Sequence, residues 1–346
     1  MSLRYVAFWI SSLFVLALVP SCTDDSPEPD KAVNKSSDNL VLISNQGNFG
    51  WGEGTLSLYD ASNQTIENEV YQKTNDESLG NVFQSITKIG SEYYLVINNS
   101  GKIVVTDSLF KKKTEITGFT SPRRCYQVGN SKAYVTDLYS DAITVINTTT
   151  NEITGDIRIG GATEYGVVFE DKFWCVSEDT DSLYAIDIST NRISFSTYVG
   201  ANPIGIEITN NEDLIILCAG DSEKAKRPSV VVYSIKLGPI FMLRMDLDSD
   251  AEPSSLAYSP KDNHILFCDR GKLYQVDNDN AFEFFEVFDF EGGTMYALDV
   301  NRETGEIYAS DAIDFVSKSK IYRISRGYDL LDDFSAGIIT GDFFFP

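Results

Sequence analysis

The sequence contains a single histidine, His264, and few basic residues, with 28 lysines and arginines against 51 aspartates and glutamates. One histidine excludes most histidine-based chemistry, including metal sites with several histidine ligands and Ser-His-Asp triads. We expect His264 to be a surface residue in a turn. The net charge of −23 argues against a nucleic-acid partner, because binding to a phosphate backbone needs clustered lysine and arginine.

Cysteine is also scarce, and no CxxC spacing indicates a metal site. Cys22 lies near the amino terminus, and the other four cysteines lie inside apolar runs such as Ile215-Ile216-Leu217-Cys218. An even number of cysteines in an exported protein permits disulfides. We nevertheless expect these four, Cys125, Cys175, Cys218 and Cys268, to be buried free thiols that pack as small apolar side chains.

One apolar run, from Tyr5 to Val19, follows the basic Arg4 and is short for a membrane-spanning helix. It ends in Leu18-Val19-Pro20-Ser21-Cys22, which looks like a bacterial lipobox. We therefore expect a signal peptide over residues 1–21 and lipid attachment at Cys22, which would anchor the chain to a membrane. The alternative is a soluble secreted protein that is cut nearby.

Residues 22–39 are acidic at first, poor in apolar side chains and spaced by prolines, which is typical of a disordered tether. An acidic cluster directly after a lipidated cysteine resembles the surface-export signal of Bacteroidetes lipoproteins. This resemblance implies an outer-membrane lipoprotein at the cell surface. The alternative is a linker that is merely solvated.

Helical periodicity is absent, and the remaining chain repeats with a period of about forty residues. Each module holds four short strands, rich in β-branched and aromatic residues, between turns rich in glycine, asparagine and aspartate. The modules cover residues 81–120, 121–161, 162–201, 202–252, 253–292 and 293 onward. Four strands per module predict the blades of a β-propeller.

Residues 40–80 match only the second, third and fourth strands of a module, with the fourth predicted at residues 65–70. Surplus sequence, residues 337–346, follows the last module. We expect this tail to supply the missing first strand, because closing the ring removes the exposed edges of an open sheet. The predicted fold is an all-β, seven-bladed β-propeller over residues 40–346, closed by a C-terminal strand that completes the first blade.

Ala133-Tyr134-Val135-Thr136-Asp137, continued through residues 144–148 to 157–160, resembles the repeat of YVTN/YncE-type propellers. With Asn45-Gln46-Gly47-Asn48-Phe49-Gly50, the carboxyl-terminal residues 336–343 and the lipobox, it is similar to a Bacteroidetes family of surface propeller lipoproteins that includes the cobalamin-capturing BtuG type. The resemblance implies binding of cobalamin or another corrinoid in vitamin B12 uptake. It also implies an outer-membrane TonB-dependent transporter as partner, with the chain a monomer or in complex with that transporter.

In a propeller, the loops between second and third strands share one face with the starts of the blades, and ligands commonly bind there. On that face we expect amides and carboxylates to bind the edge of a large polar ligand and aromatic rings to cover its apolar faces. No catalytic residue, metal ligand or required cofactor is predicted. The candidate ligand-binding residues are Asn45, Gln46, Asn48, Phe49, Trp51, Gln84, Asn98, Arg123, Arg124, Asp137, Tyr139, Glu164, Tyr165, Glu178, Asp269, Arg270, Tyr296 and Asp311.

Two alternatives remain open. Glu178, Asp137, Asp269 and Asp311 would serve a metal-dependent hydrolase, of the calcium-dependent lactonase type, if their carboxylates converged on the channel. The other alternative is a scaffold that binds a protein partner, such as a component of a glycan-uptake system. An EF-hand is not expected at residues 246–250, since glycine at the sixth position and the terminal glutamate are missing.

Overall fold

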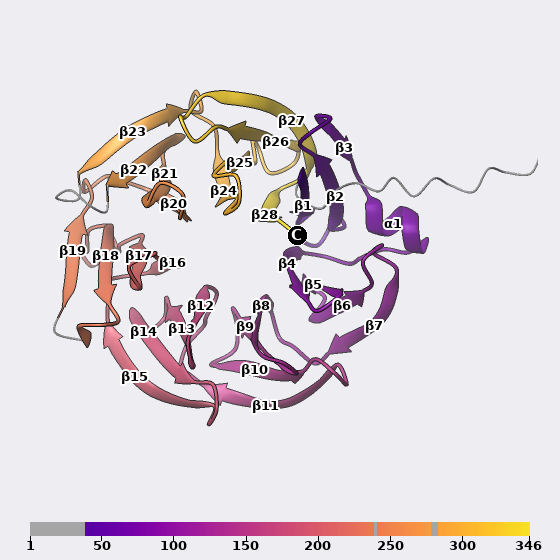
Figure 1. Ribbon diagram of the computed structural model, residues 1–346, viewed down its shortest axis with the longest axis horizontal. Coiled ribbons are helices and arrows are strands. Elements are labelled where there is room, and N and C mark those ends of the chain that lie inside the picture. Colours follow the sequence, from indigo (N-terminus) through magenta and orange to yellow (C-terminus); the bar gives the residue numbers. More distant parts are fainter. Residues whose placement is uncertain (1–38, 239–240, 278–282) are drawn as a thin grey trace, which may run out of the picture. The chain divides into compact units, whose positions relative to one another are not determined.

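The computed structural model describes residues 39–238, 241–277 and 283–346, and these form seven four-stranded antiparallel sheets arranged as blades around a ring (Figure 1). The prediction of a seven-bladed β-propeller is thereby confirmed. In each blade one strand lies at the centre of the ring and the last strand lies at its perimeter. We number the blades 1 to 7 in chain order.

Blades 1 to 4 comprise the following strands. Blade 1 contains β28 (Thr340–Phe344), β1 (Leu40–Asn45), β2 (Thr55–Asp60) and β3 (Thr65–Glu67). Blade 2 contains β4 (Phe83–Ile89), β5 (Glu92–Ile97), β6 (Lys102–Thr106) and β7 (Lys112–Thr117). Blade 3 contains β8 (Pro122–Gly129), β9 (Lys132–Asp137), β10 (Ala142–Asn147) and β11 (Glu152–Arg158). Blade 4 contains β12 (Gly166–Phe169), β13 (Lys172–Ser177), β14 (Ser182–Asp187) and β15 (Arg192–Tyr198).

Blades 5 to 7 repeat this order. Blade 5 contains β16 (Pro203–Ile208), β17 (Asp213–Cys218), β18 (Ser229–Ser234) and β19 (Met242–Asp246). Blade 6 contains β20 (Pro253–Ser259), β21 (His264–Asp269), β22 (Lys272–Asp277) and β23 (Phe284–Asp289). Blade 7 contains β24 (Met295–Val300), β25 (Ile307–Asp311), β26 (Lys318–Ile324) and β27 (Leu330–Ile338).

The apolar core lies between neighbouring blades. Tyr94 and Val96 of blade 2, for example, share one buried cluster with Cys125 and Val135 of blade 3. The second strand of a blade is covered on both faces, so its residues after the first are buried without interruption and mostly apolar. The outermost strand, in contrast, consists of exposed and half-buried residues. This packing explains why the apolar runs recur once per module.

The ring closes where β28 pairs antiparallel with β1, with Leu42 opposite Phe344 and Ile43 opposite Phe343. The buried Asn45 side chain fixes this seam, because its Oδ1 accepts hydrogen bonds from the Thr340 hydroxyl at 2.6 Å and the Gly337 amide at 2.9 Å. The prediction that the C-terminal residues complete the first blade is confirmed.

Blade 1 departs from the prediction at its outer edge. Its last strand ends at Glu67, and Val70 begins the six-residue helix α1 (Val70–Asn75) instead of ending a strand. The helix buries Val70 and Tyr71 against the core between blades 1 and 2.

His264 was expected in a turn, whereas it is the first residue of β21. It is half-buried, with Nδ1 3.1 Å from the Tyr328 hydroxyl.

The four cysteines of the described ring, Cys125, Cys175, Cys218 and Cys268, are free and buried, as predicted. Burial raises the pKa of the Cys125 thiol to about 12, so the thiolate does not form at neutral pH.

Among the described residues, no helix is both long and apolar enough to span a bilayer. Residues 1–38, with the predicted signal peptide, lipidated Cys22 and nearly all of the tether, lie outside the described residues.

Candidate functional site

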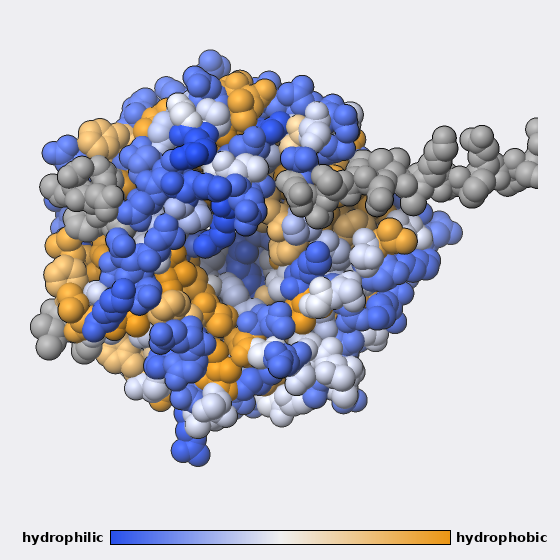
Figure 2. Space-filling view, in the orientation of Figure 1, coloured by the Kyte–Doolittle hydropathy of each residue, from blue (hydrophilic) through white to orange (hydrophobic). Residues whose placement is uncertain are grey.

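The innermost strands of the blades begin on the same face of the ring, and their first residues surround a pocket of about 300 Å³ that we call the mouth pocket. Figure 2 shows the hollow at the centre of the ring, with hydrophilic residues at its bottom and hydrophobic residues along part of its wall. The mouth pocket is lined by Gln46, Gln84, Arg123, Glu164, Tyr165, Val176, Glu178, Pro203, Ile204, Ala219, Pro253, Ser254, Met295, Tyr296 and Gly341.

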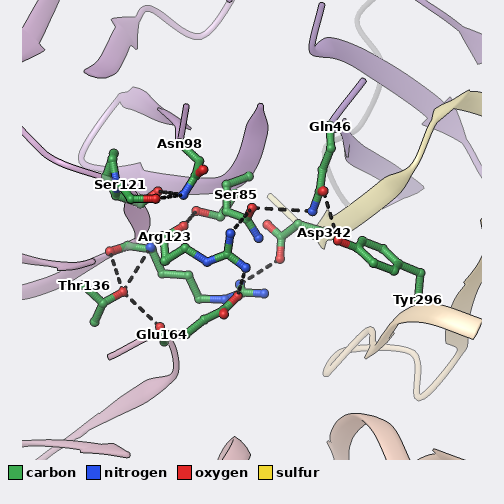
Figure 3. A network of polar contacts seen from close by, with 12 residues as sticks. Gln46, Ser85, Asn98, Ser121, Arg123, Thr136, Glu164, Tyr296 and Asp342 are labelled. Atoms are coloured by element: carbon green, nitrogen blue, oxygen red, sulfur yellow. Dashed lines mark hydrogen bonds and ion pairs between the residues drawn. The ribbon is translucent and has the colours of Figure 1, made fainter. Parts of the chain in front are cut away.

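A chain of hydrogen bonds, which we call the polar arc, runs along the mouth through five consecutive blades (Figure 3). The Tyr296 hydroxyl donates to Gln46 Oε1 at 3.0 Å, and Gln46 Nε2 donates to Gln84 Oε1 at 3.5 Å. The Arg123 guanidinium donates to Gln84 Oε1 at 2.8 Å and to Glu164 Oε1 at 2.6 Å. All five side chains were predicted from the sequence, and the structure brings them together.

Two buried hydroxyls hold the polar arc from behind. Ser85 Oγ donates to the carbonyl of Arg123 at 2.7 Å, and Thr136 Oγ1 donates to the carbonyl of Glu164 at 2.9 Å (Figure 3). Because these bonds fix the backbone on which both charged side chains stand, the ion pair is preorganised. Sequence reasoning missed Ser85 and Thr136, since hydroxyl residues are ordinary in strands.

The opposite side of the mouth pocket, which we call the apolar arc, comes from blades 5 and 6 and the start of blade 7. It consists of Pro203, Ile204, Ala219, Pro253 and Met295. The mouth therefore has one side that offers hydrogen bonds and one side that offers apolar contact. Such asymmetry suits an amphipathic small molecule.

Glu178 and Tyr165 complete the mouth. Glu178 makes no hydrogen bond or ion pair with the described residues, and its pKa is raised by partial desolvation and by the nearby carboxylates of Glu164 and Asp179. The charge of Glu164, together with burial, raises the pKa of Tyr165. The guanidinium of Arg124 lies 5.0 Å from the centre of the Tyr165 ring, so a cation–π contact holds that ring in place.

Below the mouth pocket lies the inner chamber, a cavity of about 240 Å³ that shares Tyr165, Ile204 and Tyr296 with it. Arg124 bonds Asp342 at 2.8 Å across the chamber. Burial is the largest influence on the pKa of Asp342 and raises it, although the charge of Arg124 lowers it in part.

The same chamber contains a second ion pair, between Arg302 and Glu207 at 2.8 Å, and Asp299 close to it. Burial and the negative charge of Glu207 raise the pKa of Asp299 to about 7. Sequence reasoning missed these residues. The available signal was a charged residue in the middle of an innermost strand, as in Ile206-Glu207-Ile208 and Leu298-Asp299-Val300.

A third cavity, of about 320 Å³, adjoins the mouth over blades 1 to 3 and the neighbouring edge of blade 7, and we call it the side chamber. It shares Gln46, Gln84, Arg123 and Tyr296 with the mouth pocket. The predicted residues Phe49, Asn98 and Tyr139 line it as well.

Three predicted carboxylates serve as acceptors in turns. Asp137 accepts the amides of Thr120 and Ser121 at 3.1 and 2.8 Å. Asp269 accepts the amide of Glu252 at 2.7 Å, and Asp311 accepts the amide of Thr294 at 2.8 Å. Each carboxylate belongs to the last residue of a second strand and holds the segment that leads into the same blade, a role typical of aspartate at the edge of a turn.

Five further predicted residues lie outside the mouth pocket and the side chamber. Asn45 is buried in the ring seam, Asn48 donates to the carbonyl of Phe315, and Trp51 is 97% exposed. Arg270 pairs with Asp250 at 2.8 Å and borders a separate cavity of about 130 Å³. Arg124 faces the inner chamber below the mouth pocket.

A metal centre built from the ring carboxylates is not assembled in the described part of the chain. There, no group of three or more histidine, cysteine, aspartate or glutamate side chains is placed to hold a metal ion. Of the four carboxylates considered for a hydrolase, only Glu178 lines the mouth pocket.

Comparisons with known proteins agree with the fold. Residues 40–202, which span β1 to β15, match the family model described as a domain of unknown function, DUF5074. No curated protein matches the chain. Among solved structures, a quinonprotein alcohol dehydrogenase-like protein from Bacteroides thetaiotaomicron VPI-5482 superposes with a TM-score of 0.69 at 14% identity, over 89% of this chain and 78% of that one.

Two further structures are similar in fold. Hydrazine synthase from Kuenenia stuttgartiensis has a TM-score of 0.65 and 16% identity, over 85% of this chain and 94% of that one. Virginiamycin B lyase from Staphylococcus aureus has a TM-score of 0.58 and 11% identity, over 72% and 82%. At such identities the likeness concerns the fold alone. The chain is thus a seven-bladed β-propeller, and its residues 40–202 match the DUF5074 domain.

Proposed function

We propose that this chain is a lipid-anchored cell-surface protein that captures a small nutrient at the mouth pocket and passes it unchanged to an outer-membrane TonB-dependent transporter. The lipobox-like sequence at Cys22 and the acidic residues after it support the location. The resemblance to YncE/YVTN-type propellers and to the cobalamin-capturing BtuG type supports the role.

The observation that carries this proposal is the polar arc facing the apolar arc across one pocket. The arc is preorganised by its own hydrogen bonds, so binding costs little conformational entropy. Its members position polar groups but include no nucleophile paired with a base, which favours capture over chemistry.

Cobalamin or another corrinoid is the ligand that we propose first. A corrinoid has an extended ring with an apolar face and carboxamides around its edge, which matches the two sides of the mouth. Its amide N–H groups would donate to Glu178, whose carboxylate has no partner among the described residues. Its ring would lie against Ile204 and Met295 of the apolar arc.

Isothermal titration calorimetry of the purified chain with cyanocobalamin tests this proposal. We expect saturable binding that weakens about tenfold in Glu178→Gln, because that change removes a charge-assisted acceptor. Tyr296→Phe, which breaks the first bond of the polar arc, is expected to weaken binding as well.

Arg270→Ala is the matched control, since Arg270 borders a different cavity. The affinity of this variant for cyanocobalamin should equal that of the unchanged chain. Absence of binding at micromolar cyanocobalamin would eliminate the corrinoid version. Equal affinity in all four proteins would place the ligand away from the mouth pocket.

A further inference from the structure

The floor of the side chamber carries hydrogen-bonding groups that the described part of the chain does not use. Gln84 is 3% exposed and its Oε1 accepts two hydrogen bonds, but its Nε2 amide group donates none. Asn98 is 6% exposed and its Nδ2 donates to Ser121 Oγ at 2.8 Å, but its Oδ1 accepts none. Both unused groups belong to side chains that line the cavity, so they point to a polar ligand.

The rim of the side chamber is aromatic and exposed. Phe49 and Tyr139 are 69% and 77% exposed and rise from the loops of blades 1 and 3. Phe315, from blade 7, is fixed by an edge-to-face contact with Tyr296 at 5.8 Å. Large apolar side chains that are exposed together around a polar cavity indicate a binding site.

The charge of the side chamber is balanced. Arg123 is the one charged residue that lines it among the described residues, and Glu164 neutralises this guanidinium at 2.6 Å. An anionic ligand would find no free cation there. The chamber therefore has the chemistry to suit a neutral ligand with both hydrogen-bond donors and acceptors and with an apolar face.

We propose that the side chamber is a subsite for one neutral sugar ring, a pyranose, whose hydroxyls meet Gln84 and Asn98 and whose C–H face lies on Phe49 or Tyr139. Hydroxyls suit this floor because each one donates and accepts, and so meets an unused amide nitrogen and an unused carbonyl oxygen alike. The inference goes beyond the proposed function, because it does not require a corrinoid.

Saturation-transfer NMR and chemical-shift titrations of the purified chain with methyl β-D-glucopyranoside, methyl β-D-galactopyranoside and methyl α-D-mannopyranoside test the subsite. At least one glycoside should bind with a millimolar Kd. Phe49→Ala or Tyr139→Ala should weaken that binding about tenfold. Both residues are exposed, so both variants should fold, which thermal melting checks.

Trp51→Ala is the matched control, because Trp51 is an exposed aromatic residue on the same loop as Phe49 but does not line the chamber; its affinity should be unchanged. The inference is overturned if none of the three glycosides binds at tens of millimolar, or if neither Phe49→Ala nor Tyr139→Ala weakens binding. Adenosine binding in place of the glycosides would also overturn it, in favour of a flat heterocycle. The glycoside titrations and the cyanocobalamin calorimetry are separate measurements, so either proposal can fail alone.

Discussion

Three ion pairs line the central channel. Arg123 pairs with Glu164 at the mouth, and Arg124 and Arg302 pair with Asp342 and Glu207 in the inner chamber. Asp299 lies beside these pairs without a cation of its own, and its Oδ1 accepts only the amide of Val300 at 2.7 Å. A half-buried carboxyl that is desolvated and has no cation of its own favours its neutral form.

Asp299 should therefore make stability depend on pH. Its pKa is about 7 in the folded chain, against about 3.9 in an unfolded one. Between these values the folded chain holds a proton that the unfolded chain has lost, so the free energy of unfolding falls as pH rises, by up to about 1.4 kcal/mol per pH unit. Asp299→Asn should melt higher than the unchanged chain at pH 8 and equally at pH 4.

Thermal melts across this pH range measure the effect. Glu223→Gln, at an exposed carboxylate, is the matched control. The difference in melting temperature between this variant and the unchanged chain should not grow from pH 4 to pH 8. A stability gap for Asp299→Asn that is the same at pH 5 and pH 8 would contradict the assignment.

At the scale of elements, helix α1 replaces the end of the outer strand of blade 1. It places Tyr71, which is fully buried, in the core between blades 1 and 2, and the Tyr71 hydroxyl donates to Glu77. Burial, with the adjacent carboxylate of Glu77, raises the pKa of the Tyr71 hydroxyl. The short helix thus contributes packing that β3, with three residues, does not supply.

Tyr71→Ala should lower the free energy of unfolding by about 3–5 kcal/mol, because it leaves a cavity of aromatic size in the core. Tyr71→Phe keeps the ring and should cost only about 1 kcal/mol for the lost hydrogen bond. Urea denaturation of both variants measures the difference. Near-equal stability of the two would mean that the helix is not part of the cooperative core.

The strands were predictable because each blade repeats the same burial pattern. An apolar run such as Phe173-Trp174-Cys175-Val176 indicates in the sequence a strand that is buried on both faces. Helix α1 was not predictable, since six residues are too few to display a helical period and Glu69, at its N-cap, makes no side-chain cap. The carboxylate residues Asp137 and Glu178 occupy neighbouring positions at the end of a second strand, since Asp137 is the last residue of β9 and Glu178 is the first residue after β13. Only the fold shows which one accepts backbone amides.

At the scale of the whole molecule, one seam holds the ring closed. Strand β28 carries Asp342, the partner of Arg124 in blade 3, and Phe343, which packs with Tyr308 of blade 7. Strand β28 therefore pairs with β1 to complete blade 1, and its side chains also contact blades 3 and 7.

Deletion of residues 340–346 should abolish the cooperative thermal transition, because it exposes the edge of β1 and leaves the half-buried Arg124 without its partner. A synthetic peptide of residues 338–346, added in trans, should restore the transition, and a peptide with Asp342→Ala should restore it less. Scanning calorimetry measures all three. A truncated chain that melts like the intact one would show that the seam is dispensable.

The seam also imposes a delay during biosynthesis, because its two strands come from opposite ends of the propeller sequence. Strand β1 leaves the ribosome before the strands of blades 2 to 7, whereas β28 follows them all. At about 5–20 residues per second, the nascent β1 waits roughly 15 to 60 s for its neighbour. During that interval it remains open to wrong partners, so a holding chaperone or export before folding would protect it.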